Sequence, residues 1–347
     1  MKLNFIWMAD CTWGREMTDE TDALPHEREP YANTETPPRE VDYRNAPPAP
    51  STLRREQPNR LIWVALAAFA LVILLVWLLL PTRLYPVEIA GKYGFIQQNG
   101  SVKIAPQFDG ASTFSEGLAP VLSGNSWGYV NRSGKVTIAP QFDMADPFTD
   151  DGLALVGSAG KLGFISKDGR YAINPQYQAA GVFGNGKAPV LVDGKWGYID
   201  TKGAMVIAPQ FDEASPFSEG LAAIRLGNSH GYIGKSGKIE INPQYAVAGD
   251  FHDSRAVVRV GDRFGYIDKD GKMAIPTQFE AAGDFSDGLG LIAIGQKFGY
   301  INKSGKIEIN PQFEKAASFH DGLAAVWIGN RQGYINRKGA FVWNPQA

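Results

Sequence analysis

A single unit of about 34 residues recurs eight times along the chain, and this periodicity limits the possible folds more than any other feature. Each copy is marked by a glycine that precedes an aromatic residue, at Gly94, Gly128, Gly163, Gly197, Gly231, Gly265, Gly299 and Gly333. A unit of this size cannot enclose its own apolar face, so each copy must be buried against its neighbours. We therefore expect one repeat array from Gly91 onward, not several unrelated domains.

The copy from Gly194 to Gly227 shows most clearly how one unit should fold. Three strands are predicted for each unit, because the segments are apolar, aromatic or β-branched and are separated by glycine turns. The first strand of a unit is equivalent to Leu221–Leu226, the second to Trp196–Asp200 and the third to Met205–Ile207. The remaining segment, 210–220, is predicted to be a loop. Each unit is thus a three-stranded antiparallel meander followed by a connecting loop.

Small residues recur at two strand positions and predict close packing. Gly197 and most of its equivalents follow an aromatic residue inside a strand, where glycine allows a ring or a backbone to approach or marks a β-bulge. Leu162, His230 and Gln332 depart from this pattern. Ala222 and its equivalents are expected to lie opposite something large. The equivalents of Ile224 are branched aliphatics and predict the core of the array.

These residues resemble the WG-repeat family, also called KWG-repeat, of mostly bacterial proteins. The resemblance rests on Lys195–Asp200, Pro209–Asp212 and Phe217–Ala222, and it covers about residues 86–345 in eight copies. It implies a β-repeat module of largely unknown function, often attached to signal or membrane segments, and it transfers no catalytic residue. The repeat-packing residues that we expect from it are Trp127, Gly128, Trp196, Gly197, Phe264, Gly265, Phe298 and Gly299.

The predicted fold class is all-β, with two possible arrangements of the eight meanders. They either stack into an open superhelical array or close radially into a propeller-like ring. Residues 86–89 supply a first strand to the first copy, and 341–343 supply a third strand to the last copy. Because no strand is left over for exchange between the two ends, the sequence favours the open array.

The residues before the repeats divide into two further segments. Residues 1–60 are rich in proline and acidic side chains and are predicted to be a disordered tail. Residues 61–80 contain no charged residue and are long enough to cross a bilayer, so we predict a transmembrane helix there. Arg54, Arg55 and Arg60 precede this segment while only Arg83 follows closely, which predicts a cytoplasmic tail and an extracytoplasmic, periplasmic repeat domain, residues 81–347, at a bacterial inner membrane.

Candidate chemistry is sparse. Repeated acidic residues ahead of the loop glycines, Glu116, Asp151, Glu219, Asp253, Asp287 and Asp321, are interpreted as turn residues, although a carboxylate ladder could also bind calcium or protonate a glycosidic oxygen. His252 and His320 are expected to be exposed, and His230 to be a packed imidazole. Copies differ at one surface column, where Arg225, Arg259 and Trp327 form the candidate binding surface.

The sequence therefore predicts a membrane protein that presents a WG-repeat module to a protein or to an envelope polymer. The bilayer is a further expected partner through residues 61–80. Neither a cofactor nor a metal is expected, since one cysteine and four histidines provide few ligands, and a net charge of −2 argues against nucleic acid. Enzymatic activity is not expected. Two alternatives remain: an enzyme that acts on cell-wall polymer, and a membrane signal transducer.

Overall fold

The computed structural model describes residues 65, 68–69 and 83–345. The chain divides into two units, Met1–Leu71 and Val72–Ala347. Of the first unit only Ala65, Ala68 and Phe69 are described, and they are helical and exposed. Within residues 83–345 of the second unit every regular element is a strand, which agrees with the all-β prediction.

Two sequence predictions fall largely outside this range. The disordered tail, residues 1–60, lies wholly outside the described residues, and of the predicted transmembrane helix, residues 61–80, only the three residues named above are described. In the part of the chain that the structure describes, no helix has the length and apolar character needed to cross a membrane.

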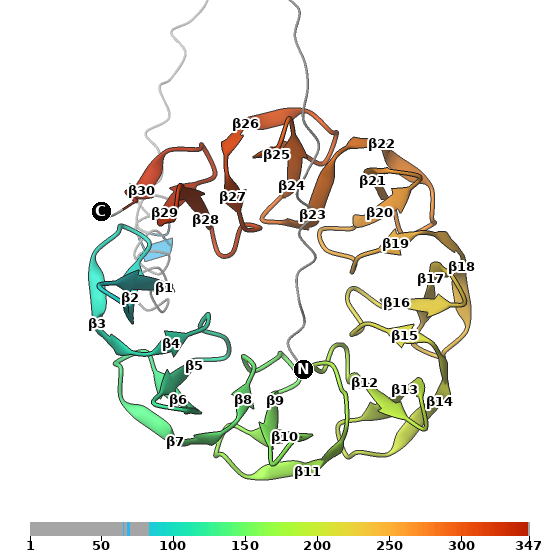
Figure 1. Ribbon diagram of the computed structural model, residues 1–347, viewed down its shortest axis with the longest axis horizontal. Coiled ribbons are helices and arrows are strands. Elements are labelled where there is room, and N and C mark those ends of the chain that lie inside the picture. Colours follow the sequence, from blue (N-terminus) through green and yellow to red (C-terminus); the bar gives the residue numbers. More distant parts are fainter. Residues whose placement is uncertain (1–64, 66–67, 70–82, 346–347) are drawn as a thin grey trace, which may run out of the picture. The chain divides into compact units, whose positions relative to one another are not determined.

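The strands of the second unit form eight sheets, which are the blades of a closed β-propeller (Figure 1). The first four blades are blade 1, β1 (Leu84–Ile89), β2 (Lys92–Gln97) and β3 (Val102–Phe108); blade 2, β4 (Gly110–Ala111), β5 (Leu118–Ser123), β6 (Ser126–Asn131) and β7 (Val136–Phe142); blade 3, β8 (Met144–Ala145), β9 (Leu153–Ser158), β10 (Lys161–Ser166) and β11 (Tyr171–Tyr177); and blade 4, β12 (Lys187–Val192), β13 (Lys195–Asp200) and β14 (Met205–Phe211).

The second half of the ring repeats the same plan. Its blades are blade 5, β15 (Glu213–Ala214), β16 (Leu221–Leu226), β17 (Ser229–Gly234) and β18 (Ile239–Tyr245); blade 6, β19 (Val247–Ala248), β20 (Ala256–Val260), β21 (Arg263–Ile267) and β22 (Met273–Phe279); blade 7, β23 (Ala281–Ser286), β24 (Leu289–Ile294), β25 (Lys297–Asn302) and β26 (Ile307–Phe313); and blade 8, β27 (Lys315–Ala316), β28 (Leu323–Ile328), β29 (Arg331–Asn336) and β30 (Phe341–Trp343).

The predicted meander is present in every blade, but it is not the whole blade. In six blades an inner strand precedes the meander and pairs with its first long strand, as Glu213 pairs with Arg225 and Ala214 with Ile224 in blade 5. This inner strand has two residues in five blades and six residues in blade 7. Blade 4 has a single bridge at this place, between Ala180 and Val190. These inner strands lie on the side of each blade that faces the centre of the ring in Figure 1, and they come from the segment predicted to be a loop.

The prediction of an open superhelical array is wrong, because blade 1 packs directly against blade 8. Their shared core cluster contains Tyr85, Val87 and Ile96 from blade 1 together with Leu323 and Tyr334 from blade 8. The absence of a strand for exchange does not prevent closure, since side-chain packing and hydrogen bonds join the two ends of the array.

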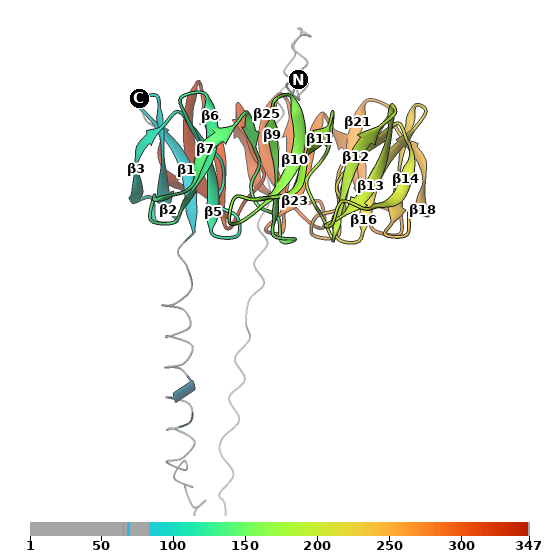
Figure 2. The same ribbon diagram turned by 90° about the horizontal axis from the view of Figure 1, so that it is seen from below.

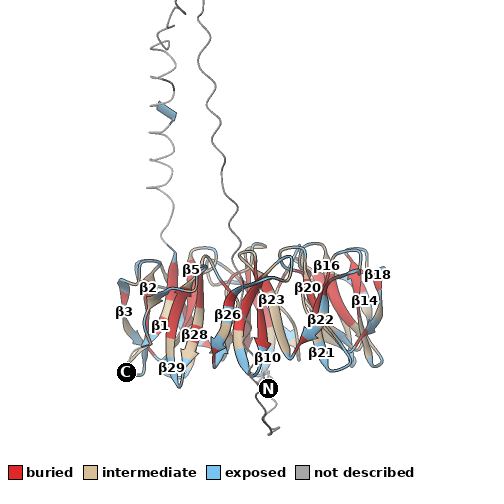
Figure 3. Ribbon diagram, turned by 90° about the horizontal axis from the view of Figure 1, so that it is seen from above, coloured by how far each residue is buried: buried red, intermediate tan, exposed pale blue. Residues whose placement is uncertain are grey.

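The core lies between blades and not inside each sheet. Between blades 4 and 5, for example, Tyr198 and Phe211 pack with Ile224 and Ile233. In Figure 3 the buried residues follow the strands of every blade, while exposed residues gather at the turns. Stability therefore depends on contacts between neighbouring copies, as in other repeat proteins.

The ring has two faces, shown edge-on in Figure 2. We call the face where β1 begins the entry face; Leu84 pairs there with Gln97, beside the turn 97–101, and the equivalent turn of blade 4 is 200–204. The opposite face carries the hairpins between the first and second long strands, such as Gly227-Asn228, and we call it the hairpin face.

Candidate functional site

The pair of an aromatic residue and a glycine that marks five of the eight repeats has a packing role. A Cβ atom on Gly197 would lie 2.6 Å from the Ile207 carbonyl oxygen and 2.7 Å from the Pro209 nitrogen, so only glycine fits. The pairing register shifts at this point, between Trp196 and Tyr198, which is the β-bulge geometry that brings the outer strand so close. Gly128, Gly265 and Gly299 have the same surroundings.

The aromatic residue before each of these glycines covers the edge of a core cluster. Trp127, Trp196, Phe264 and Phe298 are partly buried, and each packs on the cluster between its own blade and the next. Each also lies directly across from a phenylalanine of the outer strand, as Trp196 does from Phe211. The structure thus assigns these residues to packing.

The candidate binding residues Arg225, Arg259 and Trp327 occupy equivalent positions on three blades near the hairpin face. An Arg225 guanidinium nitrogen lies 2.9 Å from Glu213 Oε1, and another donates to the Gly227 carbonyl oxygen. Arg259 lies over the Phe264 ring, 5.9 Å from its centroid, and its Nε is buried without a hydrogen-bond partner in the described structure. Each arginine is thus engaged within its own blade, so the structure does not unite the two in one anion site.

Trp327 and His230 complete this set. Trp327 is partly buried on β28, between Lys315 on the short inner strand and Gln332 on β29. His230 Nε2 lies 3.5 Å from Glu213, and its Nδ1 is buried without a partner among the described residues. Glu213, Arg225 and His230 therefore form one polar cluster on blade 5, where His230 replaces the usual aromatic residue.

The acidic residues of the loop turns link successive blades on the entry face. Glu219, Asp253, Asp287 and Asp321 adopt left-handed backbone conformations, with φ between 49° and 56°. Asp253 Oδ2 accepts a hydrogen bond from the Gly288 N–H at 2.7 Å, and Asp287 Oδ2 accepts one from the Gly322 N–H at 2.6 Å. Asp253 and Asp287 thus cap the equivalent turn of the next blade, which extends the predicted role in a turn to a contact between copies.

Two of the turns also contain a histidine, His252 and His320. His252 and His320 are exposed, as predicted for turn residues. Among residues 65, 68–69 and 83–345, no group of three or more His, Cys, Asp or Glu side chains is arranged to hold a metal ion.

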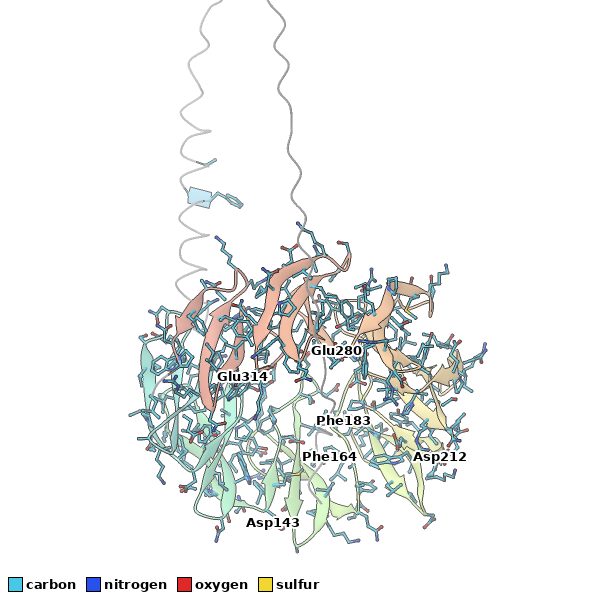
Figure 4. All side chains as sticks on the ribbon, turned by 45° about the horizontal axis from the view of Figure 1, so that its top comes forward. Asp143, Phe164, Phe183, Asp212, Glu280 and Glu314 are labelled. Atoms are coloured by element: carbon cyan, nitrogen blue, oxygen red, sulfur yellow. The ribbon has the colours of Figure 1, made fainter. Side chains whose placement is uncertain are left out.

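A second acidic column stabilises the hairpin face. Figure 4 labels four of its members, Asp143, Asp212, Glu280 and Glu314, which follow the outer strands of blades 2, 4, 6 and 7. Asp212 Oδ2 accepts a hydrogen bond from the Gly227 N–H at 2.7 Å, and its other oxygen pairs with Lys195. The hydrogen bond from Lys195 is the main reason that the pKa of Asp212 lies below its usual value.

Two carboxyl groups that the sequence reading missed lie between blades near the inner strands. Asp250 and Asp284 occupy the same position in blades 6 and 7, where blade 5 has Pro216 and blade 8 has Ser318. Burial, and then the charge of Asp284, raises the pKa of Asp250 to about 6, whereas His252 and a hydrogen bond with Ser215 oppose this shift. Burial likewise raises the pKa of Asp284. The available signal was the repeated Gly-Asp-Phe, which departs from the other copies.

Comparison with known proteins identifies the repeat. A family model described as "WG containing repeat" matches seven consecutive segments, 93–126, 127–161, 163–196, 196–229, 231–263, 264–298 and 298–331. Each match begins at or near the second long strand of one blade and ends near the same place in the next, so seven matches span a ring of eight blades. No curated protein matches the chain.

Solved structures are similar in fold alone. A dihydro-heme d1 dehydrogenase, NirN, in complex with DHE superposes with a TM-score of 0.50 at 14% identity, covering 75% of this chain and 72% of that one. A eukaryotic initiation factor gives 0.49 at 10% identity, covering 77% and 85%. At such low identity no activity transfers to this chain. The repeat matches, in contrast, cover well over half of its residues, and the chain belongs to the WG-repeat family.

Proposed function

We propose that the propeller is a binding module for a protein partner and that the apolar segment 61–80 holds it at a bacterial membrane. The first part rests on a band of equivalent positions, one in each blade, which we call the variable band. Each position lies across from the residue that precedes the bulge glycine, but the side chains at these positions differ in chemistry. These positions are Glu88, Leu122, Gly157, Leu191, Arg225, Arg259, Ala293 and Trp327.

This variable band contrasts with the positions fixed by packing. The bulge glycines and the core tyrosines repeat because each makes the same contact in successive blades. The variable band does not make one shared contact, although Gly157 and Ala293 within it are buried. It lies near the hairpins, where loops on a rigid scaffold commonly bind partners. Arg and Trp, the residue types enriched at interaction hot spots, occur there on blades 5, 6 and 8.

Capture of partners from membranes by the full-length chain tests the proposal. We expect R225A/W327A to reduce the captured partner at least ten-fold, because truncation of two hot-spot residues commonly costs more than about 1.4 kcal/mol of binding. K161A, which removes an exposed lysine of another hairpin, is the matched control. Equal capture by the native chain and both variants would refute a role for the variable band.

The membrane part of the proposal rests on the sequence of residues 61–80 and on the flanking arginines. A reporter fused after Ala347 should be active only outside the cytoplasm, and the protein should resist alkaline extraction from membranes. A cytoplasmic reporter would reverse the proposed orientation, and release by alkali would exclude the anchor.

One observation bears on the alternative of a wall-polymer enzyme. Asp250 and Asp284 provide a carboxyl pair with a raised pKa, as glycoside hydrolysis requires of its acid. The cavity of about 370 Å³ found on the ring is lined instead by Gly288, Leu289, Asn302, Glu308 and Arg337. Loss of polymer-cleaving activity in D250N, if any such activity exists in the native chain, would favour the enzyme over the binding module.

A further inference from the structure

An exposed apolar residue begins the outer strand of every blade at its entry-face end. This set, which we call the rim residues, has exposed fractions of 37% to 47% and consists of Val102, Val136, Tyr171, Met205, Ile239, Met273, Ile307 and Phe341. Isolated apolar residues on a protein surface need no explanation. Eight at equivalent positions of a closed ring lie at one level of the ring, one on each blade, and this regularity needs an explanation of its own.

Packing explains the rim residues only in part. Two of them touch the core of the preceding blade, since the Tyr171 ring centroid lies 6.3 Å from that of Phe142 and the Phe341 centroid lies 6.4 Å from that of Phe313. The inner side of each rim residue thus closes the gap between two blades. About two fifths of each side chain still faces outward, which a role in the core alone does not require.

Each rim residue also has an exposed basic neighbour within three residues. These neighbours are Lys103, Lys135, Arg170, Lys202, Lys238, Lys272, Lys306 and Lys338. Arg170 and Lys272 lie 3.5 Å and 3.7 Å from Asp168 and Asp270, but these pairs are more than half exposed and neutralise little.

Charge is distributed unevenly between this rim and the rest of the ring. The eight rim segments, 98–103, 132–137, 167–172, 201–206, 235–240, 269–274, 303–308 and 337–342, together hold 14 Lys and Arg against 4 Asp and Glu. Residues 81–347 outside these segments hold 12 basic and 21 acidic residues. Some of these acidic residues lie in the loop turns of the same entry face, and three of them, Glu116, Glu219 and Asp253, pair with lysines of the rim segments, Lys167, Lys269 and Lys303. The positive charge of the propeller is thus concentrated beside its exposed apolar side chains.

Apolar side chains flanked by Lys and Arg are typical of surfaces that lie in the headgroup region of an anionic bilayer. A closed ring presents them at one level, which suits a flat surface better than the groove of a globular partner. The chain enters the ring at Arg83 on the same face, three residues after the apolar segment 61–80 ends. We propose that the rim of the entry face docks on the surface of an anionic lipid bilayer.

This docking surface rests on the proposed membrane anchor for its location, but its chemistry is independent of it. The ring would lie with the entry face against the lipid headgroups and the hairpin face directed away. The variable band would then remain accessible to a partner, so the two surfaces serve different ligands.

Depth-dependent fluorescence quenching in vesicles tests the docking. The full chain with C11S, which removes the single native cysteine, is labelled at M273C on the rim or at V260C, an exposed apolar residue on the hairpin face. Both forms are reconstituted in phosphatidylcholine vesicles, with or without phosphatidylglycerol, that contain a headgroup spin label. We expect strong quenching at residue 273 and little at residue 260, with the difference increased by phosphatidylglycerol.

Charge reversal provides the second arm. K238E/K272E/K306E should lower the docked population by about ten-fold or more, since one basic residue near an anionic surface contributes about five-fold. K161E/R263E/R331E, which makes the same charge change on the hairpin face, should leave it unchanged. Equal quenching at residues 260 and 273, or no response to lipid charge, would overturn the docking and would favour a protein on the rim. Alkaline extraction reports on the anchor separately, so the two proposals can fail independently.

Discussion

The contact between blades 8 and 1 and the contacts between blades joined by the chain use the same design with different residues. Between blades 4 and 5, the Tyr198 hydroxyl donates to the Ser215 carbonyl oxygen, and the Phe217 ring lies 5.0 Å from the Tyr198 ring. Between blades 8 and 1, the Tyr334 hydroxyl donates to the Pro86 carbonyl oxygen, and Tyr85 supplies the second ring at 5.9 Å.

The second ring comes from a different position at the seam, our term for the contact between blades 8 and 1. Internal blades have a small residue at the strand position equivalent to Tyr85, such as Gly290 of blade 7. A Cβ atom on Gly290 would lie 2.7 Å from the Phe285 ring. This ring comes from the segment that connects blades 6 and 7, and it fills the space beside the glycine. In blade 1 the strand residue itself is large, and Tyr85 also donates a hydrogen bond to the Asp321 carbonyl oxygen. The propeller thus closes without strand exchange, because the Tyr85 side chain takes the place of the phenylalanine that a connecting segment supplies between other blades.

The turn glycines also contact the preceding blade, both inside the ring and at the seam. Gly134 packs on Ile104 of the preceding blade and Gly237 packs on Ile207, with equivalent contacts around the ring. For Gly100 of blade 1 the neighbour is Val342 of blade 8, whose carbonyl oxygen would lie 2.7 Å from an added Cβ. The seam is thus as close as the internal contacts, although no peptide bond crosses it in the described structure.

The replacement Y85A should produce the largest effect. Removal of a buried aromatic ring costs about 3–5 kcal/mol of unfolding free energy, and here it also removes the ring that packs against Tyr334 across the seam. The matched internal change is F217A, which removes the equivalent ring where the chain itself still joins the blades. Hydrogen exchange should show that Y85A exposes β1 and β29 first, whereas F217A leaves both protected. The same exchange pattern in both variants would mean that the seam has no special weakness.

The interface between blades 5, 6 and 7 should weaken as the pH rises. The folded chain retains the Asp250 proton up to a pKa of about 6, whereas the unfolded chain releases it near 3.8. The native state therefore binds more protons between these values, so stability falls as the pH rises from about 4 to about 6 and stays low above that range. This interface, unlike the seam, should thus be strongest in mild acid.

The variant D250N should remove this pH dependence. At pH 7 it should raise the unfolding free energy by up to about 3 kcal/mol, and at pH 4 it should change little, as urea unfolding at both values would show. D262N, in an exposed hairpin turn, is the control and should have no effect at either pH. A native chain whose stability is flat between pH 4 and 7 would contradict the buried-carboxyl explanation.

The sequence predicted the features that local pattern determines. The three long strands, the bulge at Gly197 and the turns follow from residue types within one repeat, and the copies reinforce one another. The short inner strands could not be predicted, because two residues such as Glu213–Ala214 carry no alternating pattern and are held only by backbone pairing. Closure depends on the angle between blades, which no single repeat encodes.

One sequence signal for closure was nevertheless present. Ala222 has small equivalents in the other internal copies, yet the first copy has Tyr85 at this place. A large residue that breaks a column of small ones at the start of an array indicates that its environment differs there. The candidate binding surface could be predicted only in part. Arg225 and Arg259 were found because they occupy equivalent repeat positions, whereas their partners Glu213 and Phe264 follow only from the folded geometry.

Removal of one tyrosine hydroxyl at a time compares a hydrogen bond at the seam with the equivalent bond between internal blades. Y334F deletes the 2.6 Å hydrogen bond to the Pro86 carbonyl oxygen at the seam, and Y198F deletes the 2.8 Å bond to the Ser215 carbonyl oxygen inside the ring. Each should cost about 1 kcal/mol of unfolding free energy, because the buried carbonyl loses its partner while the ring stays in place. A much larger loss for Y334F in thermal unfolding would show that the seam depends on this bond more than on packing.

The smallest effect is expected for the ion pairs that join blades on the entry face. Arg83 lies 3.1 Å from Asp321 across the seam, and Lys269 lies 2.9 Å from Glu219 between internal blades, with side chains 30% to 51% exposed. R83A and K269A should each lower the unfolding free energy by about 0.2–1 kcal/mol at low salt, and the loss should shrink in high salt because solvent ions screen exposed pairs. If R83A costs clearly more than K269A and the excess persists in high salt, the arginine contributes to closure through packing of its stem beside Leu84. If the two losses are equal, the seam differs from the internal contacts only in the ring of Tyr85.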